Sequence, residues 1–142
     1  MSKVEWKFLA RRECTLKTNE NFKKAHNNLN NFVPAVGELN GDRSNFQFAN
    51  ITGEKRAYGK CDFEVDFKSD TADPADSVKG NVARVYFHMM QVHNIKLDTA
   101  TLGTMLVWDK LDPVDEFECV RNQRIIFPQG LGNQFVSNQC EN

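Results

Sequence analysis

Residues 28–45 form an amide-rich stretch whose side chains are the best suited to chemistry in this sequence. The stretch contains five asparagines, two glycines, a proline and an Asp-Arg pair around a short apolar core. Because these residue types favour turns, and Asn40-Gly41-Asp42 does so most strongly, we predict a specific loop rather than a helix or a strand. The amides of Asn30 and Asn31 can cap a helix or offer a carbonyl oxygen to a hard cation. We therefore expect the functional site here.

Two arginines, Arg121 and Arg124, form the second group with possible chemistry. They are one helical turn apart, so both guanidinium groups can reach the same side of a helix and clamp a phosphate or a carboxylate. A structural role fits at least as well, because such a pair can instead bond Asp115, Glu118 or the backbone at a helix end. The residues alone leave both interpretations open.

The three histidines do not predict a metal site. His26 lies alone on an expected helix, where a partly exposed histidine is more common than a ligand. His88 and His93 are five residues apart and therefore do not share a helix face well enough to chelate a metal.

The four cysteines are scattered without a Cys-x-x-Cys pair, so a zinc site is not expected. If oxidised, they allow three pairings; if reduced, they are expected to be buried thiols, and one disulfide competes evenly with that state. The four are Cys14, Cys61, Cys119 and Cys140.

The length and composition predict one globular domain. The 142 residues are enough for a real core, and 40% hydrophobic with 26% charged residues is an ordinary folded mixture. No apolar run approaches a membrane span and the first residues lack a signal-peptide core, so we expect a soluble chain that is not exported. The net charge of -1 means that a duplex binder would depend on a local basic patch. The candidate patches are Arg11-Arg12, Lys23-Lys24, Lys55-Arg56 and Arg121 with Arg124.

Alternation of apolar and polar residues predicts two strands, over residues 45–49 and 61–68. In the second strand, Asp62, Glu64 and Asp66 point outward, and we interpret this acidic row as a solvated face rather than a metal cluster.

Capping residues and apolar periodicity predict four helices that cover these strands. They run over residues 21–30, from Asp73-Pro74 to about His93, from Asp98 to about Leu111, and from Asp112-Pro113 to the residue before Phe127. The helix ending at His93 should bury a stripe made of Val78, Val82, Val85, Met89 and Val92. The segment 127–136 then predicts a loop that orders the carboxyl-terminal tail across the sheet.

Residues 31–45 resemble a segment of the bacterial endonuclease I family, Asn-Leu-x-Pro-x-x-Gly-Glu-x-Asn-Gly-Asp-Arg-x-Asn. This resemblance implies an α+β fold of the His-Me finger (ββα-metal) class, with a small antiparallel sheet and several packed helices, in a single domain over residues 1–142. The likeness continues through most of the chain after Phe22, in Tyr58-Gly59-Lys60-Cys61, Val65-Asp66-Phe67-Lys68, Ala83-Arg84-Val85-Tyr86-Phe87, Trp108-Asp109-Lys110, Pro113-Val114, Glu118-Cys119, Arg121-Asn122-Gln123-Arg124-Ile125 and Gln129-Gly130.

The resemblance also implies a site. In such enzymes a histidine activates water, while a neighbouring glutamate and an asparagine hold one Mg²⁺ that stabilises the phosphorane and the leaving oxygen. The asparagine falls on Asn31, and we take Arg43, Arg121 and Arg124 as candidates for contacting nucleic acid. The family is largely periplasmic or secreted and disulfide-bonded.

The chain departs from the family at the Glu-His pair. The family segment Val-Glu-Trp-Glu-His-x-x-Pro reads Val-Glu-Trp-Lys-Phe-Leu-Ala here. Lys7 puts an ammonium where the family has a metal ligand, and Phe8 offers no titratable nitrogen. Residues 1–21 therefore resemble a shortened remnant of the catalytic region. Glu5 or His26 can substitute only if the register slips.

We therefore expect a degenerate endonuclease I-like protein, catalytically impaired, that acts as a scaffold binding nucleic acid or protein. Two alternatives stay open. One is an active Mg²⁺-dependent endonuclease that hydrolyses DNA or RNA with a base from elsewhere in the chain. The other is a structural subunit of a larger assembly. Membrane association is not expected.

Overall fold

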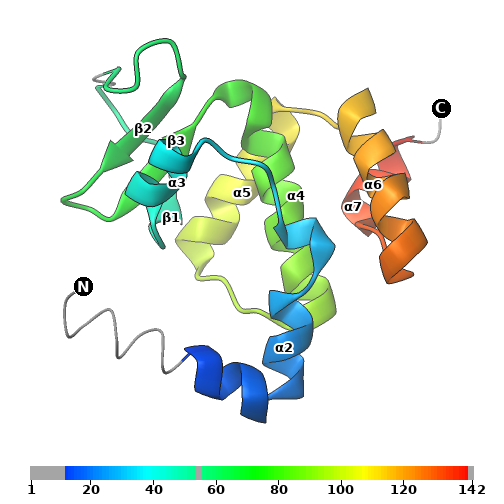
Figure 1. Ribbon diagram of the computed structural model, residues 1–142. Coiled ribbons are helices and arrows are strands. Elements are labelled where there is room, and N and C mark those ends of the chain that lie inside the picture. Colours follow the sequence, from blue (N-terminus) through cyan, green and yellow to red (C-terminus); the bar gives the residue numbers. More distant parts are fainter. Residues whose placement is uncertain (1–11, 54–55, 141–142) are drawn as a thin grey trace.

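Two packed helices, α4 (Asp76–His93) and α5 (Thr99–Leu111), form the centre of the computed structural model, which describes residues 12–53 and 56–140. A three-stranded sheet lies on one side of them, and α6 (Glu116–Gln129) and α7 (Gln134–Cys140) lie on the other (Figure 1). The predicted α+β class is confirmed. No helix in the described ranges is long and apolar enough to cross a membrane. Residues 1–11, with Lys7 and Phe8, lie outside the described ranges.

The sheet is mixed, with strand order β1-β3-β2. β2 (Phe63–Asp66) pairs with β3 (Thr71–Pro74) in the predicted antiparallel sense, whereas β1 (Gln47–Phe48) runs parallel to β3. The sequence predicted β1 and β2 but missed β3. The acidic row on β2 is not solvated throughout, because Glu64 is 6% exposed and accepts the backbone N–H of Arg56 at 2.9 Å.

The prediction that Asp73 caps the long helix is wrong. Its carboxylate accepts the backbone N–H of Ile51 at 2.8 Å and lies 3.0 Å from Nζ of Lys79. Pro74 is the last residue of β3, and α4 begins only at Asp76. Asp73 therefore joins the sheet to α4 instead of starting the helix.

The predicted stripe is only partly the buried face of α4, because Met89 is buried and Val82 packs against the core, whereas other members are exposed. Val78 and Val92 are 40% and 37% exposed. The buried face combines apolar residues with polar residues that find partners on other segments: Ala83, Phe87, Met89, Lys79, Arg84 and His88. Apolar periodicity cannot detect this face, because its polar members are buried by hydrogen bonding.

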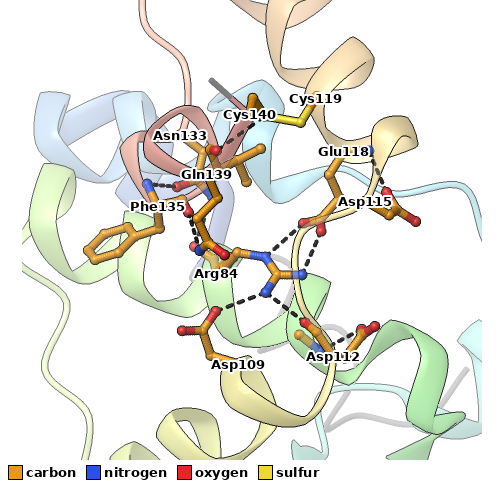
Figure 2. A network of polar contacts seen from close by, with 12 residues as sticks. Arg84, Asp109, Asp112, Asp115, Glu118, Cys119, Asn133, Phe135, Gln139 and Cys140 are labelled. Atoms are coloured by element: carbon orange, nitrogen blue, oxygen red, sulfur yellow. Dashed lines mark hydrogen bonds and ion pairs between the residues drawn. A yellow bond between two sulfur atoms is a disulfide. The ribbon is translucent and has the colours of Figure 1, made fainter. Parts of the chain in front are cut away.

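The guanidinium of Arg84 joins α4 to α5 and α6 (Figure 2). Arg84 is 0% exposed and donates to the two carboxylate oxygens of Glu118 at 3.0 and 2.5 Å. It also donates to Oδ1 of Asp109 at 2.8 Å and to the backbone carbonyl of Asp112 at 2.9 Å. Nδ2 of Asn133, just before α7, donates to the Arg84 carbonyl at 2.9 Å. One buried cation thus organises the helical half of the molecule.

The start of α5 is as predicted, with Asp98 as its N-cap accepting the N–H of Thr101 at 2.9 Å. Trp108 donates its indole N–H to Asn50 at 2.9 Å. The apolar core that α4 and α5 share is made of Ala83, Phe87, Met105 and Trp108.

Both ends of α6 differ from the prediction. Asp115 is the N-cap, while Asp112 accepts the N–H of Gly80 at 2.9 Å. The helix continues through Pro128 and ends before Gly130, which has a positive φ of 74°. The segment 127–136, expected to be a loop across the sheet, instead holds the end of α6 and the start of α7, and α7 packs against α6 and α4.

A disulfide between Cys119 and Cys140 joins α6 to α7, with an S–S distance of 2.03 Å (Figure 2). Cys14 and Cys61 are free and exposed. Of the two open alternatives, one disulfide is therefore present, and the alternative of buried reduced thiols is wrong.

The amide-rich stretch is more regular than predicted. The helix predicted over residues 21–30 is shorter, because α2 (Glu20–His26) ends before the stretch, and a separate 3₁₀ turn, η1 (Leu29–Asn31), opens the stretch. The predicted turn at Asn40-Gly41-Asp42 lies inside a helix, α3 (Gly37–Arg43). An acidic residue in the first turn of α3 and a basic residue in its last turn favour the helix by complementing its dipole.

Candidate functional site

The turn η1, which carries Asn31, is tied to the carboxyl-terminal end of α6. The N–H of Leu29 donates to Oε1 of Gln129 at 2.6 Å. Nε2 of Gln129 donates in turn to Oδ1 of Asn28 at 3.2 Å and to the carbonyl of Leu131 at 2.9 Å. One side chain of α6 therefore fixes both the cap and the first residue of η1.

Arg121 closes the other end of η1. Its Nη2 donates to the carbonyl of Phe32 at 2.7 Å and lies 3.3 Å from the carbonyls of Leu29 and Asn30. Burial lowers the pKa of Arg121, partly offset by the charge of Glu118, and arginine stays protonated throughout the physiological range. The structure thus gives Arg121 backbone partners, one of the two interpretations left open. Its contact with nucleic acid stays a prediction.

Asn28 is the N-cap of η1 and lies against two histidines of α4. Its Nδ2 is 2.9 Å from Nε2 of His88 and 2.7 Å from Nε2 of His93. The five-residue spacing had suggested only that the two rings cannot chelate a metal together, and that stays a prediction. Both rings nevertheless reach one atom of a different segment. Burial lowers the pKa of both imidazoles, and the charge of His93 lowers that of His88 further.

Asn30 and Asn31 have opposite surroundings. Asn30 is 0% exposed, with Nδ2 3.3 Å from both Oδ1 of Asn28 and Nε2 of His88. Its own Oδ1 is buried without a hydrogen-bond partner among the described residues. Asn31 is exposed, and its side chain forms no hydrogen bond within the same ranges. Asn28 does the capping, so Asn31 is the amide left to meet a ligand. Its role as a metal ligand stays a prediction.

Arg43, at the end of α3, is packed against the sheet and α4. Its guanidinium lies 4.4 Å from the centroid of the Phe48 ring. Burial raises the pKa of Tyr86, and the neighbouring charge of Arg43 opposes that shift. This position makes Arg43 a joint between elements, and a direct contact with nucleic acid stays a prediction.

Arg124 borders a shallow groove between η1 and α6. Phe32 and Phe117 in this groove are 54% and 64% exposed. Arg124 is exposed and makes no ion pair in the part of the chain that the structure describes, so its guanidinium is free to meet a phosphate. The apolar lining consists of Leu29, Phe32, Phe117, Val120 and Ile125.

A family model described as Endonuclease I matches residues 14–140 and so covers η1, the sheet and the helices up to the end of α7. The chain belongs to the endonuclease I family. The resemblance seen at residues 31–45 is thereby confirmed.

Three relatives within the endonuclease I group are each 36% identical to this chain. They are an Endonuclease-1 of Buchnera aphidicola subsp. Acyrthosiphon pisum (97% of this chain and 54% of the relative), an Extracellular deoxyribonuclease of Aeromonas hydrophila (96% and 59%) and a Periplasmic deoxyribonuclease of the same species (96% and 57%). The chain thus spans little more than half the length of the curated relatives it matches.

Membership of the endonuclease I family implies a divalent cation, and Mg²⁺ normally requires one or two carboxylates with near-octahedral geometry. Asn31 supplies one neutral oxygen. The described residues contain no group of three His, Cys, Asp or Glu side chains that could hold a metal. The described residues therefore do not by themselves fit a Mg²⁺ site, and we derive no catalytic step through the ion.

Apart from Arg121, sequence reasoning missed the residues that support η1. Asn28 had a recognisable feature, because it precedes a short turn in which its side chain accepts an N–H two residues on. Gln129 lay within a family-like motif but carried no assigned role. The pairing of His88 with His93 could not be found, because it depends on a partner about 60 residues earlier in the chain.

Proposed function

We propose that this chain is a degenerate endonuclease I-type domain that binds nucleic acid at the surface around Asn31 and has lost efficient hydrolysis. The observation that carries the proposal is an anchored η1 in a chain that lacks the family's Glu-His pair. Gln129 and Arg121 hold the turn from α6. The family resemblance aligns Lys7 and Phe8 with the catalytic Glu-His pair.

The chemistry of this exchange is unfavourable for hydrolysis. Phe8 cannot accept a proton from water, and loss of a general base slows such reactions by about 10²–10⁴-fold. Lys7 is an ammonium at neutral pH and repels a cation instead of binding it. The two changes act on different requirements, water activation and metal capture, so their effects combine.

Nucleic-acid binding requires neither a general base nor a bound metal, so the loss of both does not prevent it. The free guanidinium of Arg124 can neutralise a phosphate, and the exposed rings of Phe32 and Phe117 beside it can stack on unpaired bases. With a net charge of -1, the protein has little general attraction for a polyanion. We therefore expect weak binding that depends on salt and favours single strands.

Fluorescence anisotropy with labelled single-stranded and duplex DNA and RNA, over a series of salt concentrations, tests the binding. Arg124→Gln should weaken binding and lower the salt slope by about one. Lys110→Gln, which removes an exposed cation at the end of α5, is the matched control and should have little effect. Absence of binding to all four probes would overturn the proposal.

A plasmid-nicking assay with Mg²⁺, with and without chelator, tests the loss of hydrolysis. We expect no chelator-sensitive cleavage above background. Chelator-sensitive cleavage that Asn31→Ala abolishes would instead establish the active-enzyme alternative. Restoring the family pair with Lys7→Glu and Phe8→His should not suffice, because the neighbouring catalytic stretch is shortened.

A further inference from the structure

The side-chain amide of Asn28 is shared between η1 and two histidines of α4. Its Oδ1 accepts the backbone N–H of Asn30 at 3.0 Å. Because a backbone N–H can only donate, the amide oxygen must face Asn30 and the NH₂ must face the imidazoles. Nε2 of His88 and Nε2 of His93 lie 2.9 and 2.7 Å from that nitrogen. Each amide hydrogen can therefore bond one ring.

This orientation sets the protonation of both rings. A ring nitrogen that accepts a hydrogen bond carries no proton, so His88 and His93 are both neutral and hold their proton on Nδ1. Nδ1 of His88 is buried and has no hydrogen-bond partner among the described residues. A buried N–H without a partner is unfavourable. The contact of the Asn28 amide with His88 therefore carries an energetic cost at Nδ1. We take this cost as a sign that the contact has a role in holding η1.

We infer that His88 and His93 are positioning residues for Asn31: two unprotonated imidazoles hold the amide of Asn28, which keeps η1 in the conformation that presents Asn31. The inference rests on the function proposed above for this surface. Asn28 connects the two imidazoles directly to Asn31. Its backbone carbonyl accepts the N–H of Asn31 at 3.0 Å, and its side chain accepts the N–H of Asn30.

Protonation of either ring would place an N–H against the amide N–H of Asn28 and release the turn. Glu118 and Asp109 are bonded to Arg84, and no described contact places a carboxylate on either imidazole. Burial lowers the pKa of both rings, in agreement with this environment. The charged or titratable side chains on the neighbouring elements are Glu20, Lys23, Lys24 and His26 on α2, Asp109 and Lys110 on α5, and Glu116, Glu118, Arg121 and Arg124 on α6; η1 and α7 carry none.

Imidazole ¹⁵N NMR and amide hydrogen exchange test the inference directly. At neutral pH both rings should show the neutral Nδ1–H tautomer. Below about pH 6.5 the protection of the Asn30 backbone N–H against hydrogen exchange should fall by about tenfold per pH unit. Oligonucleotide binding should fall over the same pH range. His93→Gln, which accepts without titrating, should remove part of this acid sensitivity.

The most discriminating variant replaces the Asn28 amide, which contacts both imidazoles, with a carboxylate. In Asn28→Asp the carboxylate should accept from a protonated Nε2, raising the imidazole pKa by about one unit or more and abolishing the release by acid. Asn27→Asp, the same change at the exposed neighbouring residue, should behave as the wild type.

Three results would overturn the inference. They are an Nε2–H tautomer in either wild-type ring, an Asn28→Asp variant with the wild-type acid response, and release of the Asn30 amide without loss of binding. If Asn31→Ala leaves oligonucleotide binding unchanged, the proposed function fails separately, while ring tautomers and exchange still report on the histidine pair.

Discussion

Neutralising Glu118 should destabilise the protein far more than neutralising Asp109, although both carboxylates bond the same guanidinium. The side chain of Arg84 is 0% exposed and that of Glu118 is 7% exposed, whereas that of Asp109 is 30% exposed. Glu118→Gln turns one acceptor into an NH₂ that faces a buried cation. Asp109→Asn removes a single contact that water can partly replace.

The expected costs follow from this difference in burial. Breaking a buried ion pair by altering one partner costs about 3–5 kcal/mol. A domain of this kind has a total stability of roughly 5–15 kcal/mol, so Glu118→Gln should lower the melting temperature by about 10 °C or more. Asp109→Asn should cost about 1 kcal/mol, because a partly exposed charge is screened by solvent.

Urea denaturation followed by circular dichroism, with the disulfide intact, measures both costs. Glu116→Gln, on the exposed side of the same helical turn, is the matched control and should change the free energy of unfolding by less than about 0.5 kcal/mol. The double variant Arg84→Met with Glu118→Leu should lose less than Glu118→Gln alone, because the one charge left without its partner, Asp109, is partly exposed to solvent. A cost for Glu118→Gln no larger than that for Asp109→Asn would refute the reasoning.

Three further predictions concern stability. Gly80→Ala should cost about 2 kcal/mol in urea denaturation despite the better helix propensity of alanine, because the added Cβ would lie 1.9 Å from the Asp112 carbonyl. Cys140→Ala, measured the same way, should cost about 3 kcal/mol by freeing a loop of 21 residues in sequence separation, and a reducing agent should then have no further effect. The pKa values of His88 and His93 are lowered on folding, so their contribution should be complete above about pH 6.5 and fall as the pH drops below that value, by up to about 1.4 kcal/mol per unit for each ring. A free energy of unfolding that is flat between neutral and mildly acidic pH would contradict this last prediction.

The start of α5 was predicted correctly because its capping hydrogen bond is local in the sequence. Asp98 was placed correctly at the start of α5 because its side chain bonds an N–H three residues on, within the same segment. Asp73 and Asp112 looked similar in sequence, but tertiary partners took their carboxylates, namely Ile51 and Gly80. A capping residue can therefore be recognised from sequence only when nothing distant competes for it.

The contacts that hold the candidate site could not be predicted from the sequence. Asn31 was assigned from the long motif around it; its side chain is exposed, and its role as a ligand stays a prediction. The sequence left Arg121 open between a phosphate contact and a structural role, and the structure supplies backbone carbonyl partners about 90 residues earlier in the chain. The contacts of Asn28 with His88 and His93 were missed because a hydrogen bond between separate segments leaves no periodic pattern in the sequence.

The bond between Leu29 and Gln129 also has a consequence for how the protein is made. The two residues are 100 positions apart, and ribosomes add about 5–20 residues per second, so roughly 5–20 s separate their synthesis. Throughout that interval the nascent chain has Asn31 but lacks the helix that locks its turn. The turn that carries Asn31 is therefore fixed only after α6 has been made, and a product cut short before α6 would carry the motif without the helix that holds its turn.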